Sequence, residues 1–264
     1  MSDSLGAHPG ATLAGRHAVV TGGARGIGRA IAAALRAYGA EVTILGRTEA
    51  ALREAAAGLG DGVAWEVADV ADVDATNAAF ARIGARARGL AILVNNAGIA
   101  PTAPLLHTDP TMWQRVLAVN LTGAYHCIRA ALPALLESGH GRIVNVASTA
   151  GQVGYPYVSA YCAAKHGLVG LTRALAREFA SRAITVNAVC PGYTDTEIVR
   201  EAVDNIRQRT GRSAAEALDA LLAHNPQRRL IQPEEVANAV LWLCLPGSES
   251  VTGQCISISG GEVT

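Results

Sequence analysis

The sequence lacks several features that would assign it to common classes of protein. No apolar run reaches the ~18 to 20 residues of a membrane span, and residues 1–13 lack the basic and long apolar regions of a signal peptide. With 22 basic and 22 acidic residues there is no net charge, which argues against a general nucleic-acid or anionic-membrane binder. The cysteines and histidines show no metal-ligand spacing, so we expect no metal. Five scattered cysteines, an odd number, favour a reduced, cytoplasmic protein with buried thiols.

Strand and helix patterns alternate along almost the whole chain. Half of its 264 residues are apolar, so it can bury a large core. Short apolar runs predict strands at 17–21, 41–45, 63–67, 90–94, 142–147, 184–189 and 256–259. Helical periodicity predicts helices at 29–38, 48–59, 72–88, 111–136 with a bend near Pro133, 158–180 and 233–243.

This alternation predicts the fold class. It requires a parallel sheet with helices on both faces and right-handed crossovers. We therefore expect an α/β protein with one doubly wound, Rossmann-type domain of about seven strands. The domain covers residues 15–264 and follows a flexible segment at 1–14, while residues 194–230 are irregular and partly helical. Ligands of such sheets bind beyond the carboxyl ends of the strands, which is where the candidate residues occur.

A glycine-rich turn, residues 21–28, joins the first predicted strand to the first helix. Its sequence is T-G-G-A-R-G-I-G. Glycines let the backbone turn sharply and approach a phosphate closely, and the helix N-terminus offers free N–H groups to a pyrophosphate. Because the turn follows a strand and opens a helix, it predicts a dinucleotide site, although its spacing differs from the commoner G-x-G-x-x-G.

Tyr161 and Lys165 lie four residues apart in the predicted helix 158–180, so their side chains leave the same face. A phenol normally ionises near pH ~10. We expect the nearby ammonium to favour the phenolate and to lower its pKa. Such a tyrosine can donate a proton to a carbonyl oxygen or accept one from an alcohol.

These motifs occur together with others in a fixed order. The further motifs are Asn95-Asn96-Ala97-Gly98 after the fourth strand, Asn120 in the long helix, Ser148 after the fifth strand and Pro191-Gly192 after the sixth. From about residue 15 to 261 the chain resembles the short-chain dehydrogenase/reductase family, and within it 3-oxoacyl-thioester reductases and general carbonyl reductases. The resemblance implies an NAD(P)-dependent oxidoreductase that interconverts a ketone and a secondary alcohol by hydride transfer.

The resemblance also implies catalytic roles. Tyr161 acts as the general acid in reduction and the general base in oxidation. Lys165 lowers the pKa of Tyr161 and holds the nicotinamide ribose. Ser148 donates a hydrogen bond to the reacting oxygen, and Asn120 supports a water that links Lys165 to solvent.

For the cofactor we expect NADP(H), with NAD(H) as the alternative. An NAD-preferring relative usually has a carboxylate at the end of the second strand, where this chain has Leu45-Gly46-Arg47. Arg47 and Arg25 suit a 2′-phosphate. Asp69 and Val70 are expected near the adenine, and Thr194 and Thr196 near the carboxamide. The full set of expected cofactor contacts is Gly22, Arg25, Gly26, Ile27, Gly28, Arg47, Asp69, Val70, Asn96, Ala97, Gly98, Tyr161, Lys165, Pro191, Gly192, Thr194 and Thr196.

The substrate pocket is expected to use small and aromatic residues without a charged anchor: Ala150, Gln152, Tyr155, Tyr157 and Tyr193. By the resemblance, residues 194–230 form a substrate lid. The lid is rich in arginine, so a 3-oxoacyl-CoA or 3-oxoacyl-carrier-protein thioester stays an alternative to a neutral ketone. A dinucleotide-binding sensor or scaffold without catalysis is a further alternative, against which the presence of Tyr161 and Lys165 argues.

The expected assembly is a homotetramer, with a dimer as the alternative. Helices 111–136 and 158–180 have apolar residues around much of their circumference, including Ala124, Leu168, Leu171 and Phe179. The resemblance implies that these helices pair across a two-fold axis, and that residues 233–259 form a second contact.

Overall fold

Seven parallel strands form one sheet in the computed structural model, which describes residues 12–86 and 89–264. Across the sheet the strands are β3 (Val63–Val67), β2 (Glu41–Gly46), β1 (His17–Thr21), β4 (Leu90–Asn95), β5 (Gly141–Val146), β6 (Ile184–Pro191) and β7 (Cys255–Ile258). Every neighbouring pair is parallel. The predicted α/β, doubly wound Rossmann fold is therefore confirmed.

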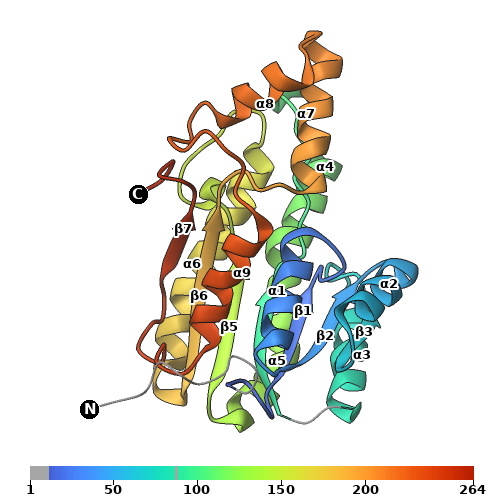
Figure 1. Cartoon of the computed structure of the whole chain (residues 1–264), viewed down its shortest axis with the longest axis vertical. Coiled ribbons are helices and arrows are strands. Elements are labelled where there is room, and N and C mark those ends of the chain that lie inside the picture. The colour runs from blue at the N-terminus through green and yellow to red at the C-terminus, as the bar shows by residue number, and fades with distance from the viewer. Residues whose placement is uncertain (1–11, 87–88) are drawn as a thin grey trace.

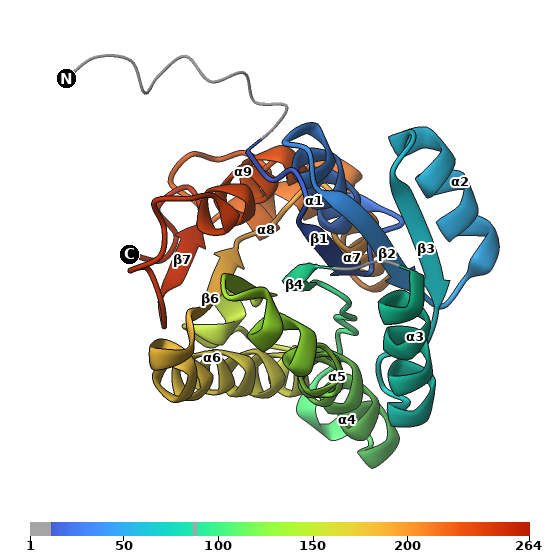
Figure 2. The same ribbon diagram turned by 90° about the horizontal axis from the view of Figure 1, so that it is seen from below.

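Helices cover both faces of the sheet (Figures 1 and 2). One face carries α1 (Gly26–Ala37), α2 (Glu49–Leu59) and α9 (Pro233–Cys244), and the other carries α3 (Val73–Arg86), α5 (Gly123–Ser138) and α6 (Ser159–Phe179). The central strands β4 and β5 are buried along their whole length. Strands covered on both faces need apolar side chains on both faces, which explains the unbroken apolar run at residues 90–94.

The expected long helix at 111–136 is interrupted, and the position of the interruption differs from the prediction. α4 (Pro110–Leu117) is followed by a π-helical turn, η3 (Ala118–Thr122), before α5 begins. α5 then continues through Pro133 to Ser138. A π turn shifts the register of the helix by one residue, and here it contains Asn120, whose side chain bonds the loop after β4.

Two helices occupy most of residues 194–230, the segment expected to be irregular and partly helical. They are α7 (Glu197–Thr210) and α8 (Ala214–Leu222), and α8 begins with a capping box between Ser213 and Glu216. Both stand above the carboxyl ends of the strands (Figure 1). This position places the segment over the expected ligand site.

The amino-terminal segment predicted to be flexible, residues 1–14, lies outside the described residues over 1–11. Leu13 is fully buried in the core beside α1 and α9. Its backbone N–H donates to Tyr38 O at 2.9 Å. Residues 12–14 therefore pack on the domain, because burial of the leucine favours an ordered position there.

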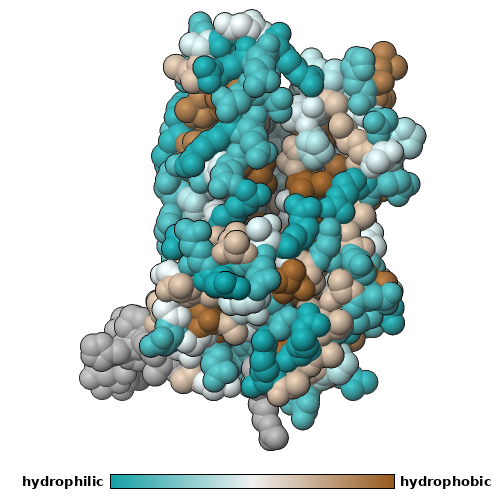
Figure 3. Space-filling view, turned by 90° about the vertical axis from the view of Figure 1, so that its right-hand side faces the viewer, coloured by the Kyte–Doolittle hydropathy of each residue, from teal (hydrophilic) through white to brown (hydrophobic). Residues whose placement is uncertain are grey.

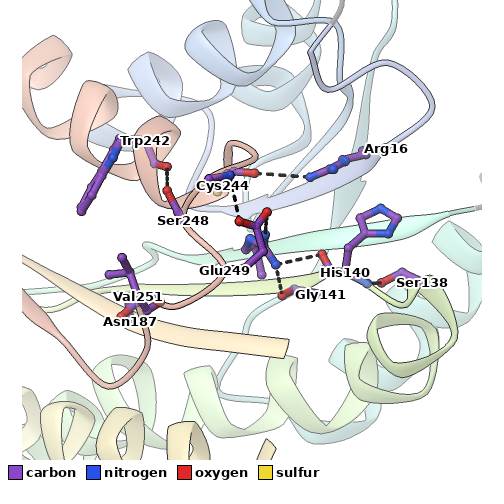
Figure 4. A network of polar contacts seen from close by, with 12 residues as sticks. Arg16, Ser138, His140, Gly141, Asn187, Trp242, Cys244, Ser248, Glu249 and Val251 are labelled. Atoms are coloured by element: carbon purple, nitrogen blue, oxygen red, sulfur yellow. Dashed lines mark hydrogen bonds and ion pairs between the residues drawn. The ribbon is translucent and has the colours of Figure 1, made fainter. Parts of the chain in front are cut away.

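A polar network at the amino end of β5 secures the loop after α9 (Figure 4). Arg142 is only 2% exposed, and its Nη2 lies 3.1 Å from Glu249 Oε1. The Arg142 Nη1 also donates to Gly141 O at 3.2 Å. Burial lowers the pKa of Arg142, and Glu249 opposes that change. A buried guanidinium requires such a partner, so this network holds the loop at the end of the sheet remote from the glycine turn.

In the part of the chain that the structure describes, every helix is too short or too polar to cross a membrane.

Candidate active site

The order of the strands reverses between β1 and β4, which are adjacent although β2 and β3 intervene in the sequence. The connections that leave the carboxyl ends of β1 and β4 diverge at this point, and a crevice for ligands opens there. From the side on which α2 and α3 lie, the upper part of the surface is hollowed and has apolar residues along the hollow (Figure 3). The sequence-based prediction places the candidate site at this same end, beyond the carboxyl ends of the strands.

The glycine turn has no room for larger residues at key positions. Gly22 adopts φ +65°, and a Cβ there would lie 2.9 Å from Asn96 Nδ2. A Cβ on Gly28 would lie 2.3 Å from Gly22 O. Both positions require glycine for steric reasons, so the turn follows a path that only this sequence pattern permits.

Asn96 holds the glycine turn from the neighbouring strand. Its Nδ2 donates to Thr21 O at 2.9 Å and to Gly22 O at 3.2 Å. The Thr21 hydroxyl in turn accepts the backbone N–H groups of Asn96 and Ala97. The N-N-A-G motif thus fixes the geometry of the turn through hydrogen bonds across the switch point.

The start of α1 suits a phosphate. Arg25 occupies the N-cap position, and no side chain of the described residues caps this helix end. The first N–H groups of a helix lack partners within the helix and favour an anion. The sterically closed turn and the uncapped helix therefore fit the pyrophosphate of a dinucleotide.

Buried amides tie the catalytic helix α6 to the centre of the sheet. Asn95 donates to Asn145 Oδ1 at 2.8 Å, and Asn145 donates to Thr172 Oγ1 at 2.9 Å. The chain of bonds runs from β4 through β5 to α6. Asn145 and Thr172 were not predicted, although an amide within an otherwise apolar strand is a visible signal in the sequence.

Lys165 is enclosed by the protein. It is 4% exposed, and its Nζ donates to Val146 O at 2.7 Å. Burial lowers its pKa to about 8. Lys165 is also the only lysine among the 22 basic residues of the chain. At this position the chain therefore uses the one basic side chain whose proton can be lost near neutral pH.

Tyr161 and Ser148 lie beside Lys165, at the carboxyl end of β5. The Nζ of Lys165 is 5.5 Å from the centre of the Tyr161 ring. Burial raises the pKa of Tyr161 to about 12, and the Ser148 hydroxyl acts in the opposite direction. The expected lowering of this pKa by Lys165 is therefore wrong for the structure, because desolvation of the phenolate dominates and the ammonium bonds a carbonyl instead.

The side chains of Asn120 and Lys165 both lie beside Gly98. A Cβ on Gly98 would lie 2.8 Å from Asn120 Oδ1 and 3.8 Å from Lys165 Nζ. The Asn120 amide donates to Ile99 O and Val116 O, and its oxygen accepts from Ile99 N. Asn120 and Lys165 also line one small, partly polar cavity. The π turn thus brings the predicted relay residue to Lys165, while its side-chain bonds secure the loop after β4.

The two candidate arginines differ in their surroundings. Arg25 forms an ion pair with Glu197, the first residue of α7. Arg47 is exposed, and no carboxylate of the described chain pairs with it. Burial acts to raise the pKa of Asp69, but the Ala71 N–H, Arg115 and Arg47 hold it below its ordinary value. The end of β2 therefore presents a cation beside the predicted adenine residue.

The segment after β6 closes the other side of the glycine turn. A Cβ on Gly26 would lie 3.2 Å from Thr196 Cγ2. Thr194 is buried, and its hydroxyl donates to Gly192 O at 3.0 Å. The structure thus brings residues 191–196 against the first βα turn, as expected for two parts of one cofactor site. The expected contacts Ile27 and Val70 have apolar neighbours in the core on either side.

The residues predicted for the substrate pocket contact different parts of the chain. The Tyr155 and Tyr193 rings meet edge to face, with centroids 6.4 Å apart. Gln152 accepts a hydrogen bond from Ser257, and Ala150 is buried beside Ser148. Tyr157 is 61% exposed and adopts φ +68°, so it lies at the rim.

Glu262 is a further residue that sequence reasoning missed. Tyr155 Oη donates to Glu262 Oε1 at 2.6 Å. The end of the chain thus brings a carboxylate to one of the residues predicted for the uncharged pocket. A glutamate after two glycines gives no sequence signal for this contact.

Comparisons with known proteins assign the family. The family model described as enoyl-(acyl carrier protein) reductase matches residues 22–262. The chain is 36% identical over 253 residues to D-beta-hydroxybutyrate dehydrogenase of Rhizobium meliloti (strain 1021), covering 92% of this chain and 97% of that protein. It is 37% identical over 252 residues to 3-oxoacyl-(acyl-carrier-protein) reductase of Vibrio harveyi, covering 94% and 98%.

A solved structure agrees with these relatives. A tryptophan variant of actinorhodin polyketide ketoreductase, solved with NADPH, superposes with a TM-score of 0.90 at 37% identity, over 94% of this chain and 97% of that one. The chain belongs to the short-chain dehydrogenase/reductase family. It is a nicotinamide-dependent oxidoreductase that acts on ketone and alcohol groups.

Proposed function

We propose that this protein reduces a ketone, or oxidises the matching secondary alcohol, with Tyr161 as the proton donor or acceptor. The observation that carries the proposal is the placement of Tyr161, Ser148 and Lys165 at the carboxyl end of β5, beside the glycine turn. The nicotinamide supplies or receives the hydride when it is bound. With a pKa raised to about 12, Tyr161 holds its proton at neutral pH, as a donor to a carbonyl oxygen must.

The other residues support this proton transfer. The Ser148 hydroxyl donates a hydrogen bond where negative charge develops on the reacting oxygen. Lys165 supplies positive charge beside the phenol and binds the ribose. Asn120 forms one wall of the cavity behind Lys165, through which a water can resupply the proton.

A panel of ketones tests the proposal. Each ketone is incubated with the protein and NADPH or NADH, and consumption of the reduced cofactor is followed at 340 nm, beside a direct measurement of cofactor binding. Turnover of at least one ketone is expected. Cofactor binding without turnover across the panel would instead favour the sensor or scaffold function.

For the substrate, we propose a ketone and retain the 3-oxoacyl thioester as the second candidate. The similarity to the Vibrio harveyi reductase and the arginines of residues 194–230 support a thioester. Two of those arginines already pair within the segment, Arg200 with Asp195 and Arg207 with Asp204, and Arg229 pairs with Glu235 just beyond it. These pairs leave fewer free cations for a coenzyme A phosphate. Comparing acetoacetyl-CoA with simple alkyl and aryl ketones distinguishes the candidates.

We propose that NADP(H) is the preferred cofactor, and that Arg47 contributes more to the preference than Arg25. Both arginines are exposed, but Arg25 already has a carboxylate partner in Glu197, whereas Arg47, at the end of β2, forms no ion pair with a described residue. Replacing Arg47 with Ala is expected to lower the ratio of kcat/KM for NADPH to that for NADH by about 10- to 100-fold, the loss of one charge-assisted contact. Arg25→Ala is expected to lower it less.

The matched control is Arg53→Ala, on the exposed side of α2, where Arg53 pairs with Glu49. It should leave the ratio unchanged. The assignment of NADP(H) would be contradicted by an NADH preference in the unmodified protein. The role of Arg47 would be contradicted if the Arg47→Ala variant had the same ratio as the unmodified protein.

We further propose a homotetramer in a reducing, cytoplasmic compartment. Of the apolar residues expected on the helix faces that contact another subunit, Ala124, Leu168 and Phe179 are buried within the chain itself. The exposed apolar residues are different ones: Tyr125 on α5 and Trp242 on α9 are 43% and 47% exposed. β7 also forms an edge of the sheet, and an unpaired edge favours association. All five cysteines are free thiols, which supports the compartment.

Light scattering at micromolar concentration tests the assembly. The expected mass is four times the 27.1 kDa of the chain. Tyr125→Glu should disrupt the contact that involves α5, and Trp242→Glu the contact that involves α9, so that each variant yields dimers. A monodisperse species of the chain mass in the unmodified protein would contradict the proposal.

A further inference from the structure

The carboxylate of Glu262 is held beside Tyr155, a residue predicted for the substrate pocket, by contacts far apart in the sequence. β7 ends at Ile258, at the same end of the molecule as α8, and the chain terminus follows (Figure 1). Tyr155 Oη donates to Glu262 Oε1 at 2.6 Å. A Cβ on Gly192 would lie 3.0 Å from Glu262 Oε2. The missing side chain at Gly192 therefore provides the space that this carboxylate occupies.

Only one of the two carboxylate oxygens has a protein partner. Oε1 accepts from Tyr155, whereas Oε2 is buried and receives no hydrogen bond from any residue that the structure describes. An acceptor that is removed from water without a donor is unfavourable, and more so when it is charged. A donor on a bound molecule would satisfy this oxygen.

The carboxylate lies at the same end of the sheet as Ser148, which follows β5. The Tyr155 ring packs edge to face on the Tyr193 ring. Burial and then the charge of Glu262 raise the pKa of Tyr193, and Tyr193 is in turn one of the groups that act on Tyr161. Glu262 therefore lies between Tyr155, in the loop that follows Ser148, and Gly192, which directly follows β6. A substrate held at Tyr161 can place a second functional group beside Glu262.

We propose that Glu262 is a specificity-determining residue that accepts a hydrogen bond from a hydroxyl group of the substrate and disfavours a carboxylate at the same place. The substrate class is then an uncharged ketone that carries a hydroxyl group apart from the reacting carbonyl. This inference rests on the proposed ketone reduction. It also separates this chain from its relative named D-beta-hydroxybutyrate dehydrogenase, whose name denotes an acid substrate.

Two pairs of small ketones test the inference with NADPH bound. Methyl acetoacetate and acetoacetate differ in charge, while 4-hydroxybutan-2-one and butan-2-one differ in a hydroxyl group. For the unmodified protein, kcat/KM is expected to favour the uncharged member and the hydroxylated member by roughly 10- to 100-fold each. Glu262→Gln removes the charge but retains an acceptor, so it should reduce the first preference at least about tenfold and largely retain the second. Glu262→Leu should remove both preferences.

The matched control is Glu178→Gln, an exposed carboxylate on α6. It should leave both ratios unchanged, and circular dichroism with thermal melting of each variant checks the fold. Equal kcat/KM for acetoacetate and its ester in the unmodified protein, or ratios unchanged in Glu262→Gln, would overturn the inference.

Binding of the same ketones, measured by saturation-transfer NMR with NADP bound, provides a readout that does not depend on turnover. Methyl acetoacetate should bind more tightly than acetoacetate, and 4-hydroxybutan-2-one more tightly than butan-2-one. If the ketones bind in the expected order but none is turned over, the proposed function is refuted and the inference is supported. If the ketones are turned over or bound without this order of preference, only the inference is refuted.

Discussion

Replacing Tyr161 with Phe is expected to lower kcat for ketone reduction by about 10²- to 10⁴-fold, the usual contribution of a positioned general acid. The substitution removes one hydroxyl and retains the ring that packs in the cluster with Val116 and Ala164. Cofactor affinity should change far less than kcat, because Tyr161 is one of many expected cofactor contacts and the glycine turn and residues 191–196 are untouched. Burial raises the pKa of Tyr161 to about 12, so in the unmodified protein the oxidation rate should increase with pH, since the base form requires loss of this proton.

Initial rates with one ketone, together with a pH profile for alcohol oxidation, measure this effect. Tyr38→Phe, at the end of α1, is the control for loss of a phenol elsewhere in the chain. Near-normal turnover of the Tyr161→Phe protein would refute the proton-transfer role.

Replacing Lys165 with Met is expected to abolish most turnover and, at neutral pH, to stabilise the fold. The methionine side chain has a similar length and no charge to desolvate. Burial lowers the pKa of Lys165 from 10.5 to about 8, which corresponds to a gain of at most about 3 kcal/mol when the charge is removed. The lost hydrogen bond to Val146 O offsets part of this gain. A functional residue that destabilises its own fold is typical of active sites.

The pH dependence has a definite sign. Between the folded pKa of about 8 and the unfolded value of 10.5, the unfolded chain binds more protons at Lys165 than the folded chain. The free energy of unfolding of the unmodified protein should therefore rise with pH through this window. The Lys165→Met protein lacks this contribution, so its advantage should be full below pH 8 and should vanish above 10.5.

Urea unfolding at pH 7 and at pH 10 measures the difference between the two proteins. Because Lys165 is the only lysine, labelling of lysine with ¹³C at Cε yields a single side-chain resonance from which its pKa can be read. A pKa near 10.5, or equal stabilities at pH 7, would contradict the expected burial of the charge. Lys165→Arg controls for turnover, since it retains a positive charge but lacks the compact ammonium.

The sequence by itself determined the order of the elements and indicated the principal candidate catalytic residues. Alternating strand and helix patterns are local properties, and a strand such as residues 90–94 must be covered on both faces whatever its neighbours are. Tyr161 and Lys165 share a helix face because of helical periodicity alone. The glycine-rich stretch at residues 21–28, between a strand and a helix, is likewise a local pattern. Each inference needed only residues that are close together in the chain.

Only the tertiary structure decided the contacts between distant segments. Tyr155 and Glu262 are 107 residues apart in the sequence, and Arg25 and Glu197 are 172 apart, yet each pair is in contact. The π turn at Asn120 depends on the loop after β4, and the pKa of Tyr161 depends on how many apolar groups surround it. Such contacts arise when β6, β7 and α7 assemble at one end of the sheet. Local sequence patterns do not encode which side chains meet there, because packing among many elements selects the partners.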